Sequence, residues 1–137
     1  SSAASDVYKR QGFKTALVTN KMRMVTEAFV QRTGLNVDLN ALVAGDDTDH
    51  PKPAPDMLLL ACKKLGVSPA EAVMVGDSEN DALAARAAGI RAMLVSTGYN
   101  GTIPMTQWAA ENGFSLVFGS VAGIKDYIFA CEGKFGN

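Results

Sequence analysis

The sequence predicts an α/β protein with a doubly wound, Rossmann-like parallel sheet, and three observations carry this prediction. Short apolar runs recur along the chain, segments with helical spacing separate them, and glycine ends most of those segments. Strands that are apolar throughout are typical of a parallel sheet whose two faces are covered by helices. Right-handed crossovers between such strands then give the doubly wound arrangement.

Predicted strands and helices alternate along the chain after residue 11. The strands are the apolar runs at residues 16–18, 41–44, 72–76, 92–95 and 116–118. The helices are expected at residues 22–33, 55–65, 79–88, 105–111 and 121–131. In the first helix Met24, Val25 and Phe29 recur at helical spacing. Pro55 stands at the start of the second, as proline does in the first turn of many helices.

The length and composition suit one domain. The chain has 137 residues, of which 47% are hydrophobic and 20% are charged, as in an ordinary globular protein. Residues 1–11 (SSAASDVYKRQ) are polar and aperiodic, unlike the segments that follow them. We therefore expect residues 1–11 to be a non-native extension and residues 12–137 to form the domain.

Charge and cysteine content exclude several classes of partner. The net charge is −1 and the pI is near 5.7, which gives no electrostatic reason to expect nucleic acid or an anionic membrane. No apolar run approaches the ~20 residues that span a bilayer. Cys62 and Cys131 lie far apart in apolar helical segments. This predicts no disulfide framework and a reducing, cytoplasmic location.

Polar residues follow the predicted strands at the points where the strands end. Thr19, Asn20 and Lys21 follow the first strand, and the segment DSEND (residues 77–81) follows the third. A loop after the second strand carries acidic residues, a histidine and a lysine between prolines: Asp46, Asp47, Asp49, His50 and Lys52. Ligands bind at the carboxyl ends of strands in open α/β sheets, so we expect Thr19, Lys52 and Asp77 to share one rim.

These residue types suit a phosphate together with a divalent cation. A threonine hydroxyl and backbone N–H groups at a helix N-terminus donate hydrogen bonds to phosphate oxygens. The ammonium of Lys52 would neutralise charge on a transferring phosphoryl group. The carboxylate of Asp77 is a hard oxygen ligand of the kind that Mg²⁺ binds.

Three segments resemble motifs of the haloacid dehalogenase-like hydrolase superfamily, in its order and spacing. LVTNK (residues 17–21) resembles the second motif, an apolar strand ending in serine or threonine. Lys52 in PKPAPD resembles the lysine of the third motif, and VGDSEND (residues 75–81) resembles the fourth. The loop STGYNG (residues 96–101) is similar to one common among phosphoglycolate phosphatases. The resemblance runs from about Gly12 to the C-terminus.

The resemblance implies a role for each matched residue. The catalytic residues would be Lys52, Thr19 and Asp81, and the substrate-binding residues would be Thr19, Asn20, Lys52 and Ser78. Mg²⁺ would be the cofactor, held by Asp77 and by Asp81, the latter through hydrogen bonds to the metal's ligands or to Lys52. The partner would be a small phosphorylated metabolite.

Simpler interpretations stand beside these roles. Thr19 could cap the following helix, and Asp77 and Asp81 could be a cap and a first-turn charge. Lys52 could be a solvated loop residue. For Arg23 we expect a solvated helix start, and for the acidic residues after the second strand a solvated loop. For His50 we do not expect a catalytic role.

The superfamily's first motif, a strand ending in Asp-x-Asp, has no counterpart before Thr19. In the family, its first aspartate attacks phosphorus to form an aspartyl-phosphate and its second acts as acid and base. The family's cap domain has no counterpart either. We therefore expect this chain alone to be inactive. The missing strand would lie between the strands ending at Thr19 and Asp77, so we also expect marginal stability, aggregation, or re-pairing of those two strands.

The leading hypothesis is a magnesium-dependent phosphomonoester hydrolase, with 2-phosphoglycolate as the best substrate hypothesis. One alternative is another superfamily member, such as a sugar-phosphate phosphatase, a phosphoglucomutase-like enzyme or a dehalogenase. A different class of alternative is a phosphate- or partner-binding α/β module without catalysis. The sequence does not indicate an oligomeric state.

Overall fold

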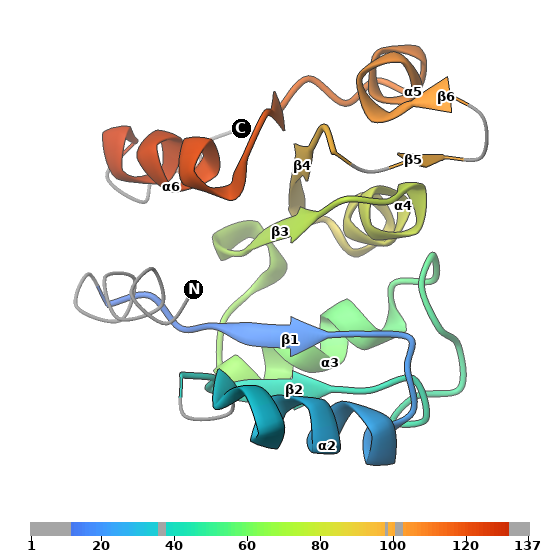
Figure 1. Cartoon of the computed structure of the whole chain (residues 1–137), viewed down its shortest axis with the longest axis vertical. Helices are drawn as coiled ribbons and strands as arrows, with labels where there is room; N and C mark the ends of the chain where they lie inside the picture. The colour runs from blue at the N-terminus through green and yellow to red at the C-terminus, as the bar shows by residue number, and fades with distance from the viewer. Residues whose placement is uncertain (1–11, 36–37, 98, 101–102, 132–137) are drawn as a thin grey trace. The chain divides into compact units, whose positions relative to one another are not determined.

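A computed structural model describes residues 12–35, 38–97, 99–100 and 103–131 (Figure 1). The segment predicted to be a non-native extension, residues 1–11, lies outside these described residues. The chain divides into two compact units, Ser1–Ser68 and Pro69–Asn137. Both units contain parallel strands with helices, which confirms the predicted α/β class.

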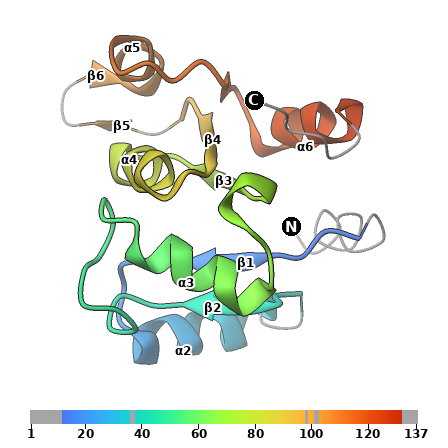
Figure 2. The same ribbon diagram turned by 180° about the vertical axis from the view of Figure 1, so that it is seen from behind.

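The first unit is a pair of parallel strands with two helices. Its elements are β1 (Ala16–Val18), α2 (Arg23–Thr33), β2 (Ala41–Val43) and α3 (Asp56–Leu65). β1 and β2 pair in register from Ala16 opposite Ala41 to Val18 opposite Val43. The two helices lie on opposite faces of this sheet, with α2 in front in Figure 1 and α3 in front in Figure 2. The carboxyl ends of both strands therefore point toward the same edge, which carries the loops that follow.

The core of the first unit lies between α3 and the sheet. Val43 and Met57 are fully buried, and Ala61 packs with them. Apolar positions of α3 recur at helical spacing (Met57, Leu58, Ala61 and Cys62), so one face of the helix is buried. Gly66 ends the helix in the left-handed conformation, with φ of 70°.

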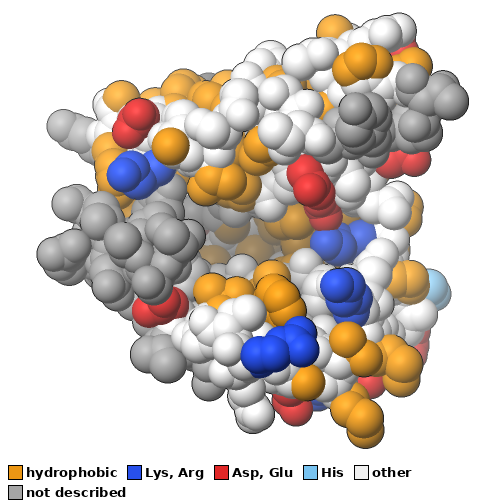
Figure 3. Space-filling view, viewed as in Figure 1, with side chains coloured by type: hydrophobic (Ala, Val, Ile, Leu, Met, Phe, Trp, Pro, Cys, Tyr) orange, Lys and Arg blue, Asp and Glu red, His pale blue; other side chains and the backbone are white. Residues whose placement is uncertain are grey.

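Helix α2 confirms the predicted helix but presents its apolar residues outward. Met24 is 82% exposed, and the other exposed apolar residues of this segment are Met22, Val25 and Phe29. Figure 3 shows hydrophobic side chains on the surface of the part of the molecule that holds α2. The buried residues of the helix are Thr26 and Val30. Helical spacing predicted the element correctly without predicting which face is covered.

The second unit has a three-stranded parallel sheet in the order β3-β4-β7. Its elements are a 3₁₀ turn at Pro69–Glu71, β3 (Val73–Gly76), α4 (Glu79–Ala88), β4 (Arg91–Val95), β5 (Tyr99–Asn100), β6 (Ile103–Pro104), α5 (Met105–Glu111), β7 (Val117–Phe118) and α6 (Val121–Ala130). The strand pair β5–β6 is antiparallel and was not predicted. It spans only two residues on each side, too few for an alternating pattern to be visible. Residues 98 and 101–102 of the same loop lie outside the described residues.

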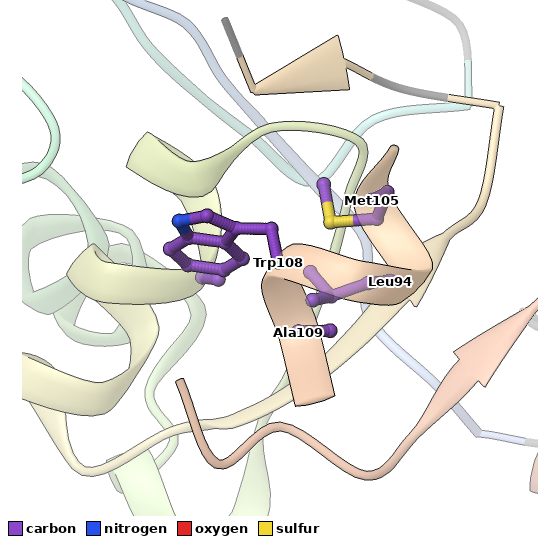
Figure 4. Close-up of a cluster of buried hydrophobic side chains, with 5 residues drawn as sticks. Leu94, Met105, Trp108 and Ala109 are labelled. Atoms are coloured by element: carbon purple, nitrogen blue, oxygen red, sulfur yellow. The ribbon is translucent and has the colours of Figure 1, made fainter. Parts of the chain in front are cut away.

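The core of the second unit is built around Trp108. Met105, Trp108 and Ala109 of α5 are buried against Leu94 of β4, and Figure 4 shows these four side chains gathered together. The rings of Trp108 and Phe114 stack with centroids 5.5 Å apart. Both aromatic residues therefore serve packing in the second unit.

Strands β1 and β3 are edge strands of their sheets. Within the described part of the chain, β1 pairs only with β2, and β3 pairs only with β4. Val75 of β3 is 41% exposed, which is unusual for a strand of a parallel sheet. None of the helices in the described ranges has the length and apolar character needed to cross a membrane.

Candidate functional site

The loop after β1 is held against the end of β2 by backbone hydrogen bonds. The Thr19 N–H donates to the Val43 carbonyl at 3.0 Å, and the Gly45 N–H donates to the Lys21 carbonyl at 2.7 Å. The hydroxyl of Thr19 accepts the Lys21 N–H at 3.2 Å. The N-cap of α2 is Met22, without a side-chain cap. The interpretation of Thr19 as the cap of this helix is therefore wrong.

Arg23 ties α2 to the turn after β2. Its guanidinium donates to Asp47, with Nε 2.9 Å from Oδ1, and to the carbonyl of Leu42 at 3.0 Å. It also pairs with Glu27 at 2.9 Å, one turn along the helix. The backbone N–H of Arg23 donates to Asp46 at 2.7 Å, so Asp46 supplies the missing helix cap from another segment.

These contacts correct two interpretations of the sequence. Arg23 is half-buried and paired, not a solvated helix start, and Asp47 is half-buried against it instead of being solvated. Asp46 and Asp49 are exposed as expected, although Asp46 also caps α2. Hydrogen bonding from Arg23, with a further bond from the Ala44 N–H, lowers the pKa of Asp47 from its ordinary 3.8 to about 2, against the opposing effect of partial burial. The same pair raises the pKa of Arg23. The partners lie 23 and 24 residues apart, so no local pattern could reveal them.

Lys52 lies in the loop between β2 and α3, beside the end of β1. Its ammonium donates to the carbonyl of Val18, the last residue of β1, at 3.0 Å. Its backbone N–H donates to Oδ1 of Asn20 at 2.9 Å, and its carbonyl accepts from Nδ2 of Asn20 at 3.0 Å. The Lys52–Pro53 peptide bond is cis. The structure thus places Thr19, Asn20 and Lys52 together at the carboxyl end of β1.

The side chain of His50 contacts the start of α3. Its Nδ1 lies 3.0 Å from the Asp56 carboxylate at the start of α3, and its side chain is 70% exposed. The imidazole therefore supports the beginning of a helix, where a carboxylate is already favoured by the helix dipole.

The second unit places three further candidates at the end of β3. Asp77 follows Gly76 directly and is exposed, and Ser78 is the N-cap of α4. The hydroxyl of Ser78 accepts the Asp81 N–H at 3.3 Å. Asp81 is only 8% exposed, and its carboxylate accepts the Asp77 N–H at 3.2 Å. The cap is thus Ser78, and the buried carboxylate of Asp81 orders the turn that presents Asp77.

Gly76 is required by this close approach. A methyl group at residue 76 would overlap the side chain of Asp81, with its carboxylate oxygen only 2.6 Å away. Glycine lets the helix start pack directly against the strand end. The sequence motif contained this glycine, and the structure supplies its physical reason.

The donor set of the second unit fits a hard cation. Asp77 offers an exposed carboxylate. Asp81, which follows it by 4 residues, offers a buried carboxylate. Among the described residues no group of three or more His, Cys, Asp or Glu side chains is arranged to hold a metal ion. Mg²⁺ binds through one or two carboxylates and retains water and phosphate oxygens as further ligands. The exposed carboxylate of Asp77, supported by Asp81, therefore suits a hard divalent cation and not a closed zinc site.

Comparison with known families and proteins gives one consistent result. The haloacid dehalogenase-like hydrolase family matches residues 3–89 of the chain. This range contains Thr19, Lys52 and Asp77, the residues that carried the resemblance. It begins inside residues 1–11, whose non-native origin stays a prediction.

Curated relatives and solved structures agree with this match. A plasmid-encoded phosphoglycolate phosphatase of Cupriavidus necator is 48% identical over 93 residues, which are 68% of this chain and 40% of that protein. A pyrophosphatase of Bacillus velezensis is 37% identical over 86 residues, covering 63% of this chain and 40% of that protein. The crystal structure of a predicted phosphoglycolate phosphatase from Haemophilus somnus superposes with a TM-score of 0.81 at 28% identity, covering 92% of this chain and 54% of that one. The chain spans less than half the length of the curated relatives it matches.

Proposed function

Because this chain belongs to the haloacid dehalogenase-like hydrolase family, we propose that it carries the phosphate- and magnesium-binding part of a phosphomonoester hydrolase. The observation that carries the proposal is the position of Lys52, whose ammonium lies 3.0 Å from the last carbonyl of β1. Thr19 follows that carbonyl directly in the chain. A cation and a hydroxyl at the carboxyl end of a strand are the groups that bind a phosphoryl oxygen.

Each residue of the first unit has a distinct task in this proposal. The Thr19 hydroxyl and the backbone N–H groups that follow it donate to the phosphoryl oxygens. The Lys52 ammonium neutralises charge on the phosphoryl group and on the attacking carboxylate. The attacking carboxylate belongs to the first motif of the family, which has no counterpart before Thr19 in this sequence.

The second unit supplies the metal-binding groups. Asp77 would hold Mg²⁺ directly, Asp81 would orient the turn that carries Asp77, and Ser78 would donate its hydroxyl to substrate. Bound Mg²⁺ supplies positive charge that offsets the charge of the phosphoryl group.

The proposed substrate is 2-phosphoglycolate. The names of the Cupriavidus necator relative and the Haemophilus somnus structure support it, whereas the Bacillus velezensis relative makes pyrophosphate the compound to compare. Both compounds present a terminal phosphoryl group, so Thr19 and Lys52 do not discriminate between them. Discrimination would depend on groups around the rest of the substrate.

A binding experiment on the 137-residue chain tests the proposed site. Inorganic phosphate should shift the amide resonances of Thr19 and Lys52 in an NMR titration with Mg²⁺ present. Replacing Mg²⁺ by paramagnetic Mn²⁺ should broaden the resonances of Asp77 and Asp81. Unchanged resonances at Asp77 would contradict the metal site, and unchanged resonances at Thr19 and Lys52 would contradict the phosphate site.

A chimera tests the proposed reaction. The N-terminal part of the Cupriavidus necator relative, which contains the segment preceding its matched region, would be joined to this chain at Gly12. The chimera should hydrolyse 2-phosphoglycolate faster than pyrophosphate, and Lys52→Met should remove about 10²-fold or more of kcat, as loss of an electrostatic group at a transferring centre does. Hydrolysis that is unaffected by Lys52→Met would contradict the assignment.

A further inference from the structure

The side chain of Asn20 binds the backbone of Lys52 at two points. Its Oδ1 accepts the Lys52 N–H at 2.9 Å, and its Nδ2 donates to the Lys52 carbonyl at 3.0 Å. The two residues are 32 positions apart in sequence and belong to loops after different strands. The amide therefore joins the loop that carries Thr19 to the loop that carries Lys52.

From this geometry we infer that Asn20 is a positioning residue, whose side chain fixes the Lys52 backbone so that the lysine ammonium stays at the end of β1. The inference deepens the proposed phosphate site and rests on it. It changes the role that sequence motifs suggest for Asn20, because the side-chain amide serves lysine and not the phosphoryl group. Asn20 would then contribute to phosphate binding only through its backbone.

We call the two hydrogen bonds between the Asn20 side chain and the Lys52 backbone the clamp. The sequence around Lys52 explains why this clamp is effective. Lys52 lies between Pro51 and Pro53, and proline has no backbone N–H. The N–H of Lys52 is therefore the only backbone donor of these three residues, and Asn20 accepts it. The four-carbon stem of a lysine side chain is flexible, so its ammonium can occupy many positions. Movement of the backbone would add to that range, and holding the backbone in place limits it.

Asn20 is itself held by a close backbone contact. A methyl group added to Gly45 would overlap the backbone carbonyl oxygen of Asn20, so the two backbones lie directly against each other. The Gly45 N–H also donates to the carbonyl of Lys21, the next residue. The clamp thus connects Lys52 to a segment whose own position is set by the end of β2.

Amide hydrogen exchange of the 137-residue chain tests the clamp without any ligand. Asn20→Ala should increase the exchange rate of the Lys52 N–H about tenfold, the upper range for one lost hydrogen bond. Asn20→Asp keeps the oxygen acceptor but loses the donor to the Lys52 carbonyl, so its increase should be smaller. It also preserves the side-chain size, which guards against a general loss of folding.

Asn40 offers a matched control in the same sheet. Its Oδ1 accepts the Thr15 N–H at 3.0 Å at the opposite end of the two strands. Asn40→Ala should change exchange at Thr15 but leave exchange at Lys52 within about twofold of its original rate, since distant sites act independently. Equal exchange at Lys52 in the original chain and in Asn20→Ala would overturn the inference.

A double-mutant cycle with inorganic phosphate separates positioning from direct binding. Asn20→Ala should weaken phosphate binding in the original chain, and should weaken it no further once Lys52 is replaced by methionine. An equal loss in both backgrounds would show that Asn20 binds phosphate itself and would overturn the inference. If the original chain binds no phosphate, the proposed function fails, while hydrogen exchange at Lys52 still decides whether the clamp exists.

Discussion

The guanidinium of Arg23 and the carboxylate of Asp47 form a two-point ion pair that joins the first turn of α2 to the turn after β2. Asp47 also accepts the Ala44 N–H at 2.9 Å, so the pair is anchored to the backbone at the end of β2. Asp46 caps the backbone N–H of Arg23 from the same turn. The segment that carries Thr19 is thereby fixed at the point where it enters the helix.

This pair should make stability depend on acid pH. The folded-state pKa of Asp47 is about 2 and its ordinary value is 3.8, so its stabilisation is fully present above about pH 4 and is lost as the pH falls toward 2. Partial solvent screening limits the contribution to about 1 kcal/mol. Urea denaturation should show Asp47→Asn less stable by about that amount at pH 6, with the difference vanishing near pH 2.

Asp49→Asn is the control for this prediction. Asp49 is exposed in the same loop, and the change removes the same charge. Exposed charges of this kind contribute within about 0.5 kcal/mol. An equal loss of stability in both variants, or a difference for Asp47→Asn that persists at pH 2, would count against the role of the ion pair.

The same ion pair shows which part of the fold the sequence predicts. The strands and helices were predictable because apolar runs and glycine stops are local signals. The orientation of α2 was not, because Arg23 and its partner Asp47 are far apart in sequence. The buried residues of the helix are Thr26 and Val30. The buried face of α2 therefore does not follow the pattern of its apolar residues, several of which are exposed.

The candidate site also has features that the sequence predicts and features that it does not. Thr19, Lys52 and Asp77 stand out in the sequence because each follows a strand within a motif of fixed spacing. The hydrogen bonds between Asn20 and Lys52 could not be predicted, because they join two loops whose approach depends on strand pairing. Sequence motifs identify residue types at a strand end, whereas the division of tasks among them comes from the contacts.

Gly45→Ala should disturb the Thr19 loop. The added methyl group would meet the backbone carbonyl of Asn20, which cannot rotate away as a side chain would. Overpacking of this kind costs about 1–3 kcal/mol. We expect that loss in urea denaturation, together with shifted amide resonances at Asn20 and Lys21. Gly119→Ala is the control, because a methyl group there meets nothing within 4 Å, and its stability should be unchanged or slightly higher.

Gly76→Ala should weaken metal binding in the second unit. Its methyl group would displace the Asp81 side chain, and with it the hydrogen bond from the Asp77 N–H. A lost supporting contact to a metal ligand costs about 10- to 100-fold in affinity. Titration with Mn²⁺ should show a loss in that range, whereas Gly89, at φ of 75° with open space around it, should tolerate Asn without an effect on Mn²⁺. Unchanged Mn²⁺ affinity in Gly76→Ala would show that Asp81 does not support the metal site.

The 137-residue chain should not turn over phosphate esters. It has no Asp-x-Asp before Thr19 to provide the attacking carboxylate and its acid–base partner. With saturating Mg²⁺, hydrolysis of 2-phosphoglycolate should equal that of a Lys52→Met variant. Clear turnover that disappears with Lys52→Met would refute this and would require a nucleophile elsewhere in the chain.

The exposed edge of β3 should promote aggregation. In the described part of the chain β3 pairs on one side only, and Val75 is 41% exposed on it. An apolar edge strand is a template for pairing between molecules. Val75→Thr keeps a β-branched residue that favours a strand, so stability should change by less than about 0.5 kcal/mol while light scattering on heating begins at a higher temperature.

Val95 on β4 is the matched position, since it is only 8% exposed. There the same substitution buries a hydroxyl and should cost about 1–3 kcal/mol. If scattering begins at the same temperature with threonine or valine at residue 75, the edge of β3 is not the surface through which the molecules associate.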